Sequence, residues 1–119
     1  MKTIVPVDEI NATVTVPGSK SYTQRALITA ALAQGRSVIR DALVSEDTAY
    51  LIDALGHLGA RIKQDGASLT VDGTHGKPAC PSQGLMMGNN GTGLRLLASV
   101  AALCDGRVTI DGSARMRQR

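Results

Sequence analysis

The chain has 119 residues, which is enough for one domain with a single core. Hydrophobic residues make up 43% of it and aromatic residues only 2%, so the core has to be aliphatic and stacking of nucleic-acid bases on aromatic rings is nearly ruled out. The net charge is +3, and Arg115, Arg117 and Arg119 account for all of that excess, so we expect local anion pockets and no nucleic-acid partner.

The N-terminal part of the sequence predicts a strand followed by a helix. Residues 13–16 alternate polar and apolar side chains, which indicates a strand, and the Pro-Gly pair behind them ends it. A helix capped by Ser19 or Ser21 then runs to about Gln34, and Gly35 suits its left-handed C-terminal position.

The other expected elements come from helical or alternating spacing between glycine-rich turns. They are a strand at 37–40, a helix from Ser45 to Gly59, a hairpin of 60–64 and 68–72, a loop over 73–83, a short buried strand at 85–87, a helix from about 91 to 104, and a strand at 107–111. Leu32, Gly35, Arg36 and Ile39 match Leu103, Gly106, Arg107 and Ile110 in spacing. This echo predicts a duplicated β-α-β unit and a mixed helix and sheet fold.

Two helix starts carry cations where the helix dipole disfavours them. Lys20 and Arg25 lie in the first turns of the first long helix, and a bound anion is the simplest compensation for that conflict. Ser21 is four residues before Arg25 and shares its face of the helix. The alternative is that both cations are ordinary solvated surface charges.

A similar arrangement recurs over residues 88–95. The glycines there leave backbone N–H groups open to a ligand at a helix start, and Arg95 is expected on the same side as Gly91. Arg115, Arg117 and Arg119 alternate, so an extended chain would place them on one face, with a solvated tail as the alternative. The two helix starts together predict a site for a small, multiply anionic molecule.

Several other kinds of site do not fit the sequence. The lysine of Gly18-Ser19-Lys20 is not preceded by the glycine pattern of a phosphate-binding Walker loop, and 88–93 lacks the dinucleotide-binding spacing. Cys80 and Cys104 are expected to be free thiols, with no metal and no cofactor. We expect no membrane partner and a cytoplasmic location, since no apolar run is long enough to cross a bilayer and no signal peptide is recognisable.

Four segments together resemble the 5-enolpyruvylshikimate-3-phosphate synthase branch of the enolpyruvyl transferase family. They are Pro17–Leu27, Ser45–Asp47, Gly88–Arg95 and Asp111–Arg119. The resemblance implies an α/β (α+β) fold of two lobes built from repeated β-α-β-α-β-β units, of which this chain would be a partial N-terminal lobe. Residues 1–17 would be a strand segment that packs with the other lobe, and 18–119 a partial substrate-binding lobe.

The resemblance also implies a reaction and roles in it. The enolpyruvyl group of phosphoenolpyruvate would move to the 5-hydroxyl of shikimate-3-phosphate with release of phosphate, and glyphosate would occupy the same pocket. Lys20 would be catalytic and would contact phosphoenolpyruvate. Ser21 and Arg25 would hold shikimate-3-phosphate, Gly91 and Arg115 would hold phosphoenolpyruvate, Asn89 and Thr92 would shape that pocket, and Asp47 and Arg95 would support it.

Family members are much longer than this chain, so its main partner would be the C-terminal remainder of the same enzyme. That remainder would supply the groups that transfer protons. Two alternatives stay open at this point: a relative that acts on UDP-N-acetylglucosamine, and a non-catalytic anion-binding module derived from the family.

Overall fold

The structure is a computed structural model that describes residues 2–118. Its elements are α1 (Lys20–Leu32), β1 (Arg36–Ile39), α2 (Glu46–His57), β2 (Arg61–Asp65), β3 (Ser68–Asp72), β4 (Leu85–Met86), α3 (Gly91–Ala101), β5 (Ile110–Asp111) and α4 (Ala114–Arg117). None of the helices in this range is long and apolar enough to cross a membrane.

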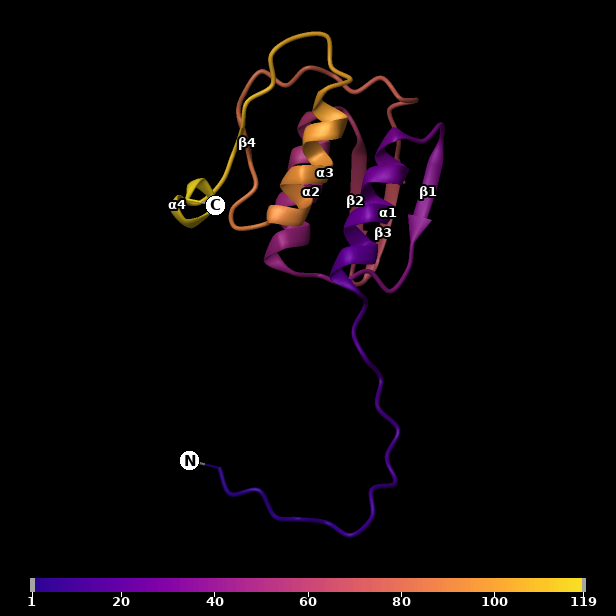
Figure 1. Cartoon of the computed structure of the whole chain (residues 1–119). Coiled ribbons are helices and arrows are strands. Elements are labelled where there is room, and N and C mark those ends of the chain that lie inside the picture. Colours follow the sequence, from indigo (N-terminus) through magenta and orange to yellow (C-terminus); the bar gives the residue numbers. More distant parts are fainter. Residues whose placement is uncertain (1, 119) are drawn as a thin grey trace.

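Three strands form one sheet, with β3 antiparallel between β1 and β2. Helix α1 packs on β1 and β3, α2 packs on β2, and α3 lies against both α1 and α2 (Figure 1). Strands β4 and β5 form a separate parallel pair beside the helices. Helices α1 and α2 therefore cover one face of the sheet and α3 packs on these two helices, while the other face carries no helix among the described residues.

The core between helices and sheet is aliphatic, as the composition predicts. Its largest fully buried apolar side chains are Leu27, Leu51, Leu55, Leu58, Leu69, Val71, Leu85, Met87 and Leu97. Small residues on α1, Ala30 and Ala31, let the segment after β3 approach closely, and the Thr74 backbone N–H donates to the Ala31 carbonyl at 2.8 Å. Gly73 sits at this approach, where a Cβ would overlap the carbonyl oxygen of Ala33.

The predicted helix starts are confirmed. The Ser19 hydroxyl accepts from the Tyr22 backbone N–H at the start of α1. At the start of α2, Ser45 and Thr48 form a reciprocal capping box, in which the Thr48 N–H donates to the Ser45 hydroxyl at 3.3 Å. Gly35 has φ +84°, the left-handed conformation expected behind α1.

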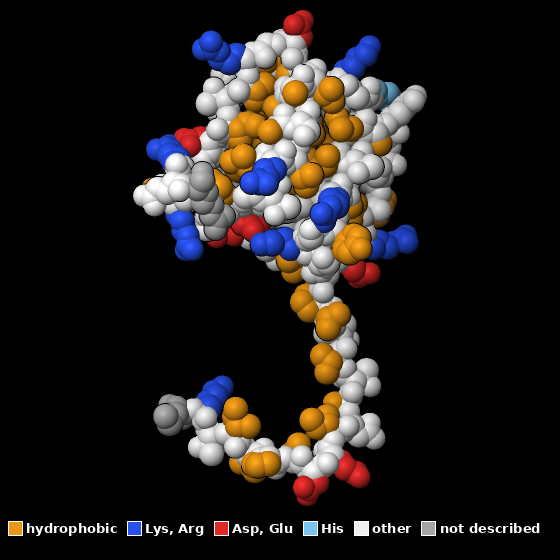
Figure 2. All heavy atoms as spheres, viewed as in Figure 1, with side chains coloured by type: hydrophobic (Ala, Val, Ile, Leu, Met, Phe, Trp, Pro, Cys, Tyr) orange, Lys and Arg blue, Asp and Glu red, His pale blue; other side chains and the backbone are white. Residues whose placement is uncertain are grey.

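The predicted strand at 13–16 is wrong for this structure. Residues 2–19 contain no strand and lead away from the body as an extended arm (Figure 1), with the side chains of Ile10, Val14 and Val16 exposed. A strand needs a hydrogen-bonding neighbour, and neither β1 nor β2 pairs with the arm at its free edge. Figure 2 shows hydrophobic side chains distributed along the arm.

Two boundaries near the C-terminus are also corrected. Helix α3 ends at Ala101 instead of about 104, and the last strand covers Ile110–Asp111 instead of 107–111. The strand is short because its partner β4 offers only two residues for pairing. The predicted echo is present in part: α1 and α3 are each followed by a glycine with positive φ and then a strand. The β-α-β unit itself is not duplicated, because no strand precedes α1 among the described residues.

Truncation of a core leucine tests this packing. Leu51 is fully buried, so Leu51→Ala is expected to lower the free energy of unfolding by about 2–5 kcal/mol, through lost apolar burial and the cavity left behind. Leu103→Ala is the matched control, because that side chain is 55% exposed and its loss should cost about 0.5 kcal/mol or less. Urea unfolding measures both, and equal losses would contradict the described core.

Candidate anion-binding site

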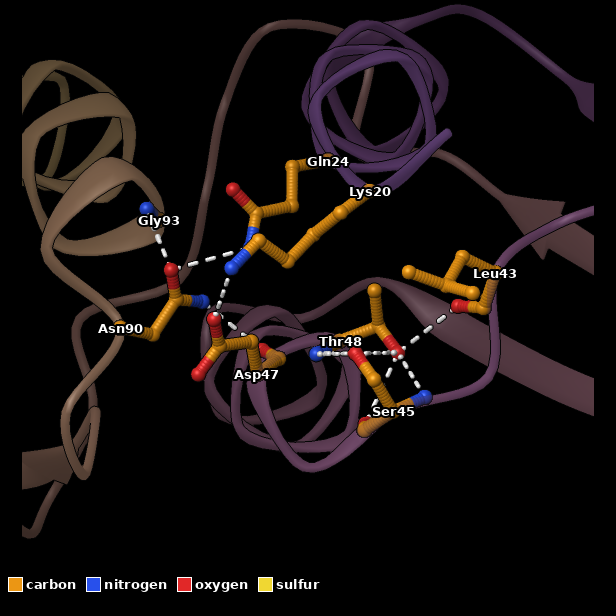
Figure 3. Close-up of polar contacts among 8 residues, drawn as sticks. All are labelled: Lys20, Gln24, Leu43, Ser45, Asp47, Thr48, Asn90 and Gly93. Atoms are coloured by element: carbon orange, nitrogen blue, oxygen red, sulfur yellow. Dashed lines mark hydrogen bonds and ion pairs between the residues drawn. The ribbon is translucent and has the colours of Figure 1, made fainter. Parts of the chain in front are cut away.

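The N-terminal ends of α1, α2 and α3 meet at one place (Figure 3). The Lys20 ammonium on α1 lies 2.7 Å from an Asp47 carboxylate oxygen on α2. The Asn90 side chain, at the start of α3, donates from Nδ2 to the Asp47 carbonyl at 2.7 Å and accepts at Oδ1 from Gln24 Nε2 of α1 at 2.9 Å. The three positive helix ends are therefore joined directly by side chains.

Asn90 is the residue on which this junction converges. It caps α3, its Oδ1 accepts from the Gly93 backbone N–H at 2.8 Å, and the whole residue is only 1% exposed. A Cβ on Gly93 would overlap the Asn90 amide. Gly93 thus leaves space for the Asn90 side chain, which caps α3 and also contacts α1 and α2.

The first turns of α1 and α2 carry side chains of opposite charge. Helix α1 has no acidic residue in its first turn, and Lys20 opposes its dipole, whereas Asp47 in the first turn of α2 favours that helix's dipole. The Lys20 side chain is 50% exposed, so an anion can reach it from solvent. Glu46 is the other acidic residue in the first turn of α2, so two carboxylates accompany Lys20 and the three positive helix ends.

Ser21 and Arg25 lie together on the adjoining side of α1, as their spacing predicts. The Arg25 guanidinium donates to the Ser21 hydroxyl and, at 3.3 Å, to the Ser21 carbonyl. Arg25 is exposed and Ser21 is half-buried. A hydroxyl and a planar cation at this spot suit recognition of a carboxylate or phosphate.

A second part of the site is a cavity of about 490 Å³ between α3 and α4, lined by Gly91, Thr92, Leu94, Arg95 and Met116. The expectation that Arg95 lies on the same side as Gly91 is confirmed. Asn89 is exposed just before the α3 cap, with its carbonyl accepting from the Gly91 N–H at 3.1 Å. An anion here would be stabilised by the positive N-terminal end of α3.

The C-terminal arginines are not arranged as the alternation predicts. Residues Ala114–Arg117 form one helical turn capped by Ser113, so Arg115 and Arg117 do not share a face, and Arg119 lies outside the described residues. The turn forms because Ser113 supplies an N-cap oxygen to the Met116 N–H at 3.3 Å. Arg115 is exposed beside Met116 and does not line the cavity.

The segment before α4 is fixed by a carboxylate. The Asp111 oxygens accept from the Arg117 guanidinium and from the Gly112 backbone N–H, and these bonds lower the pKa of Asp111 to about 2. The Ser113 N–H donates to the Gly88 carbonyl at 2.7 Å, which attaches this segment beside the α3 start. In this way the strand pair β4 and β5 brings α4 to the cavity.

All of the predicted residues except Arg115 therefore fall into two neighbouring groups. Lys20, Ser21, Arg25 and Asp47 gather at the starts of α1 and α2, and Asn89, Gly91, Thr92 and Arg95 gather at the start of α3. The Gln24 to Asn90 hydrogen bond connects the groups. Within residues 2–118, no cluster of three His, Cys, Asp or Glu side chains could hold a metal.

Sequence reasoning missed the side-chain roles of Gln24, Asn90 and Met116. Gln24 falls on the same stripe of α1 as the buried Leu27 and Ala31, so a polar residue on an apolar face was the available signal. No local signal places Met116 against α3, because that contact depends on the pairing of β4 with β5.

Comparison with known proteins identifies the family. Residues 4–119 match the family model of EPSP synthase (3-phosphoshikimate 1-carboxyvinyltransferase). The chain belongs to the EPSP synthase family. Its fold agrees, because an EPSP synthase structure from Acinetobacter baumannii aligns with a TM-score of 0.84 and 29% identity over 89% of this chain and 24% of that one.

Two curated relatives carry the name 3-phosphoshikimate 1-carboxyvinyltransferase. The one from Syntrophobacter fumaroxidans is 44% identical over 99% of this chain, and the one from Methanoregula boonei is 50% identical over 92%. This chain covers 28% and 26% of them, respectively, so it spans about a quarter of the relatives' length. The mixed α and β class that the sequence predicts is confirmed, and the chain matches a partial region of EPSP synthase structures.

A pair of glycine substitutions tests the role assigned to Gly93. Gly93→Ala should displace the Asn90 amide and cost about 0.5–2 kcal/mol of unfolding free energy, the usual value of a lost helix cap. Gly56→Ala in α2 meets nothing within 4 Å and should raise stability by up to about 1 kcal/mol. Urea unfolding of the two variants measures both, and a stabilising Gly93→Ala would contradict the geometry.

The ion pair of Asp111 predicts a pH effect. Its folded pKa of about 2 lies below the unfolded value of 3.8, so the stability it contributes is complete above about pH 4 and is lost as the pH falls toward 2. Asp111→Asn should therefore lower the melting temperature at pH 5. Near pH 2 the melting temperature of the variant should approach that of the parent protein. Asp105→Asn, at an exposed carboxylate without an ion pair among the described residues, is the control. A difference in melting temperature between the Asp111 variant and its parent that stays constant from pH 5 to pH 2 would contradict the assignment.

Proposed function

We propose that this chain is the N-terminal substrate-binding part of an enzyme that transfers the enolpyruvyl group of phosphoenolpyruvate to the 5-hydroxyl of shikimate-3-phosphate and releases phosphate. The observation that carries the proposal is the junction of three helix N-termini with Lys20 at its surface. Both substrates carry carboxylate and phosphate groups, and such groups are stabilised at positive helix ends. The name of the two relatives, 3-phosphoshikimate 1-carboxyvinyltransferase, describes this transfer.

Each part of the site has a task in this proposal. Arg25, held against Ser21, binds the carboxylate of shikimate-3-phosphate, for which its planar guanidinium is suited. Gly91 lines the cavity for phosphoenolpyruvate, where a residue without a side chain lets the ligand approach the backbone closely. Arg115, exposed on the adjoining α4, binds the same substrate from outside that lining. Asn89 and Thr92 shape that pocket, which is also the site proposed for glyphosate.

Lys20 is the proposed catalytic residue. Its ammonium faces Asp47, and half of its side chain is exposed, so a ligand can contact it from solvent. An anionic substrate offers it a second negative partner, so Lys20 can bind phosphoenolpyruvate and stabilise charge that develops on the reacting groups. Asp47 supports the site from α2, beside Lys20, and Arg95 supports it from α3, beside the cavity. The transfer is an addition followed by an elimination, so it requires no cofactor.

The proposed partner is the C-terminal remainder of the same enzyme. The arm exposes Ile4, Val5, Val7, Ile10, Val14 and Val16, a set of apolar side chains that a folded neighbour would cover. We propose that residues 1–17 pack with the other lobe and that 18–119 form part of the first lobe. A cytoplasmic location is proposed as well, because Cys80 and Cys104 are both free thiols.

The experiment is fragment complementation. The chain is mixed with the part of the Syntrophobacter fumaroxidans relative that follows the matched region, and phosphate release is measured with both substrates. We expect turnover from the mixture and none from the chain alone. Lys20→Met should lower kcat/KM by roughly 10²-fold or more, because a positioned charge is lost. Lys63→Met, at an exposed lysine on the far side of the sheet, is the control and should leave it unchanged.

The same assay separates this function from its alternatives. Replacement of shikimate-3-phosphate by UDP-N-acetylglucosamine should abolish phosphate release, and turnover with the sugar nucleotide would assign the chain to the sister transferase. Robust turnover by the 119-residue chain alone would refute its proposed role as a part. A mixture that assembles but never releases phosphate with either acceptor would favour an anion-binding module without catalysis.

A further inference from the structure

Gln24 is an unusual residue for the centre of this fold. It is 0% exposed in the seam between α1 and α3, and its Nε2 donates to Asn90 Oδ1 at 2.9 Å. Its own oxygen, Oε1, is buried without a hydrogen-bond partner among residues 2–118. A buried acceptor in that state destabilises the folded protein, so an apolar side chain of similar length would pack there at lower free-energy cost. Stability alone does not explain a glutamine at this position.

The cap of α3 does not explain it either. Asn90 already satisfies the Gly93 N–H through Oδ1 and the Asp47 carbonyl through Nδ2, and neither bond involves Gln24. The additional bond from Gln24 changes one thing: it fixes the rotation of α1 relative to the α3 start (Figure 3). We call the set of Gln24, Asn90, Asp47 and Gly93 the amide junction.

The residues next to Gln24 on α1 show what that rotation controls. Lys20 is four residues earlier and lies on the same face, whereas Arg25 is the next residue and lies on the adjoining face with Ser21. Gly91 follows Asn90 directly and lines the cavity. The two ends of the Gln24 to Asn90 bond are thus adjacent to the two groups of candidate site residues.

We propose that Gln24 is a positioning residue, which acts through Asn90 to hold Lys20 and the start of α3 at Gly91 in the relative geometry that the enolpyruvyl transfer requires. This proposal rests on the proposed function. Gln24 itself contacts no substrate, since its side chain is fully buried. A small rotation of α1 would displace the long Lys20 side chain, and displacements of about 1 Å can cost roughly 10²-fold in rate.

The test is Gln24→Met in the complemented enzyme. Methionine has a similar length and removes both the hydrogen bond and the unpartnered acceptor. We expect a melting temperature equal to or above that of the parent, while kcat falls about tenfold or more with little change in the KM values. Gln64→Met is the matched control, because Gln64 is an exposed residue of β2 and its substitution should alter neither quantity.

A second substitution shows whether Gln24 acts through Asn90. Asn90→Ser keeps a capping hydroxyl for Gly93 but cannot span the distance to Gln24. In that background Gln24→Met should have no further effect on kcat, the non-additivity expected of residues in one network. Independent, multiplying losses in kcat would overturn the proposal. So would an unchanged kcat in Gln24→Met, or a fall in kcat matched by a fall in melting temperature.

Failure of the proposed function gives a different result. In that case the parent mixture releases no phosphate, and the junction is judged by amide hydrogen exchange of the full chain. Gln24→Met should then accelerate exchange at the Gly93 N–H by about tenfold relative to Gln64→Met, because the Asn90 acceptor loses its fixed orientation. Unchanged exchange at Gly93 would overturn the positioning role without reference to catalysis.

Discussion

The buried Asn90 amide is the constraint on which the candidate site depends. One side chain, 1% exposed, binds the carbonyl of Asp47, the backbone N–H of Gly93 and the side chain of Gln24. The N-terminal ends of three helices carry positive partial charge and gain nothing from being placed together. The amide junction holds them together nonetheless, and the conflict is reduced where Asp47 faces Lys20. An anionic ligand would reduce it further.

Chain topology explains why the three helix ends meet at all. Strands β1 and β2 are both antiparallel to β3, so they run in the same direction. Each follows a helix and carries the chain back, and α1 and α2 therefore begin at the same end of the layer. Helix α3 joins them after β4, with its start brought to the same place by Asn90. The pairing of β4 with β5 then returns the chain, so that Met116 closes one side of the cavity.

Local chemistry made most elements predictable from the sequence, whereas contacts between distant segments did not follow from it. The caps Ser19 and Ser45 and the turn at Gly35 depend on neighbouring residues, and all three are as predicted. The strand at 13–16 failed because alternation indicates a strand only where a partner exists. Residue types identified Lys20 and Arg25 as site candidates, but the 66-residue separation of Gln24 from Asn90 hid the bond that relates them.

Exposure of the candidate residues indicates what the proposed second lobe would add. Lys20, Arg25 and Arg115 are all exposed, so water screens their attraction for an anion. Two unit charges 4 Å apart interact by about 1 kcal/mol in bulk water and by about 4 kcal/mol at the lower effective dielectric of a protein surface. The same side chains would therefore bind and polarise a substrate several times more strongly once a second surface excluded water. In the proposed enzyme this segment supplies the aligned charges and the remainder supplies the enclosure that makes them effective.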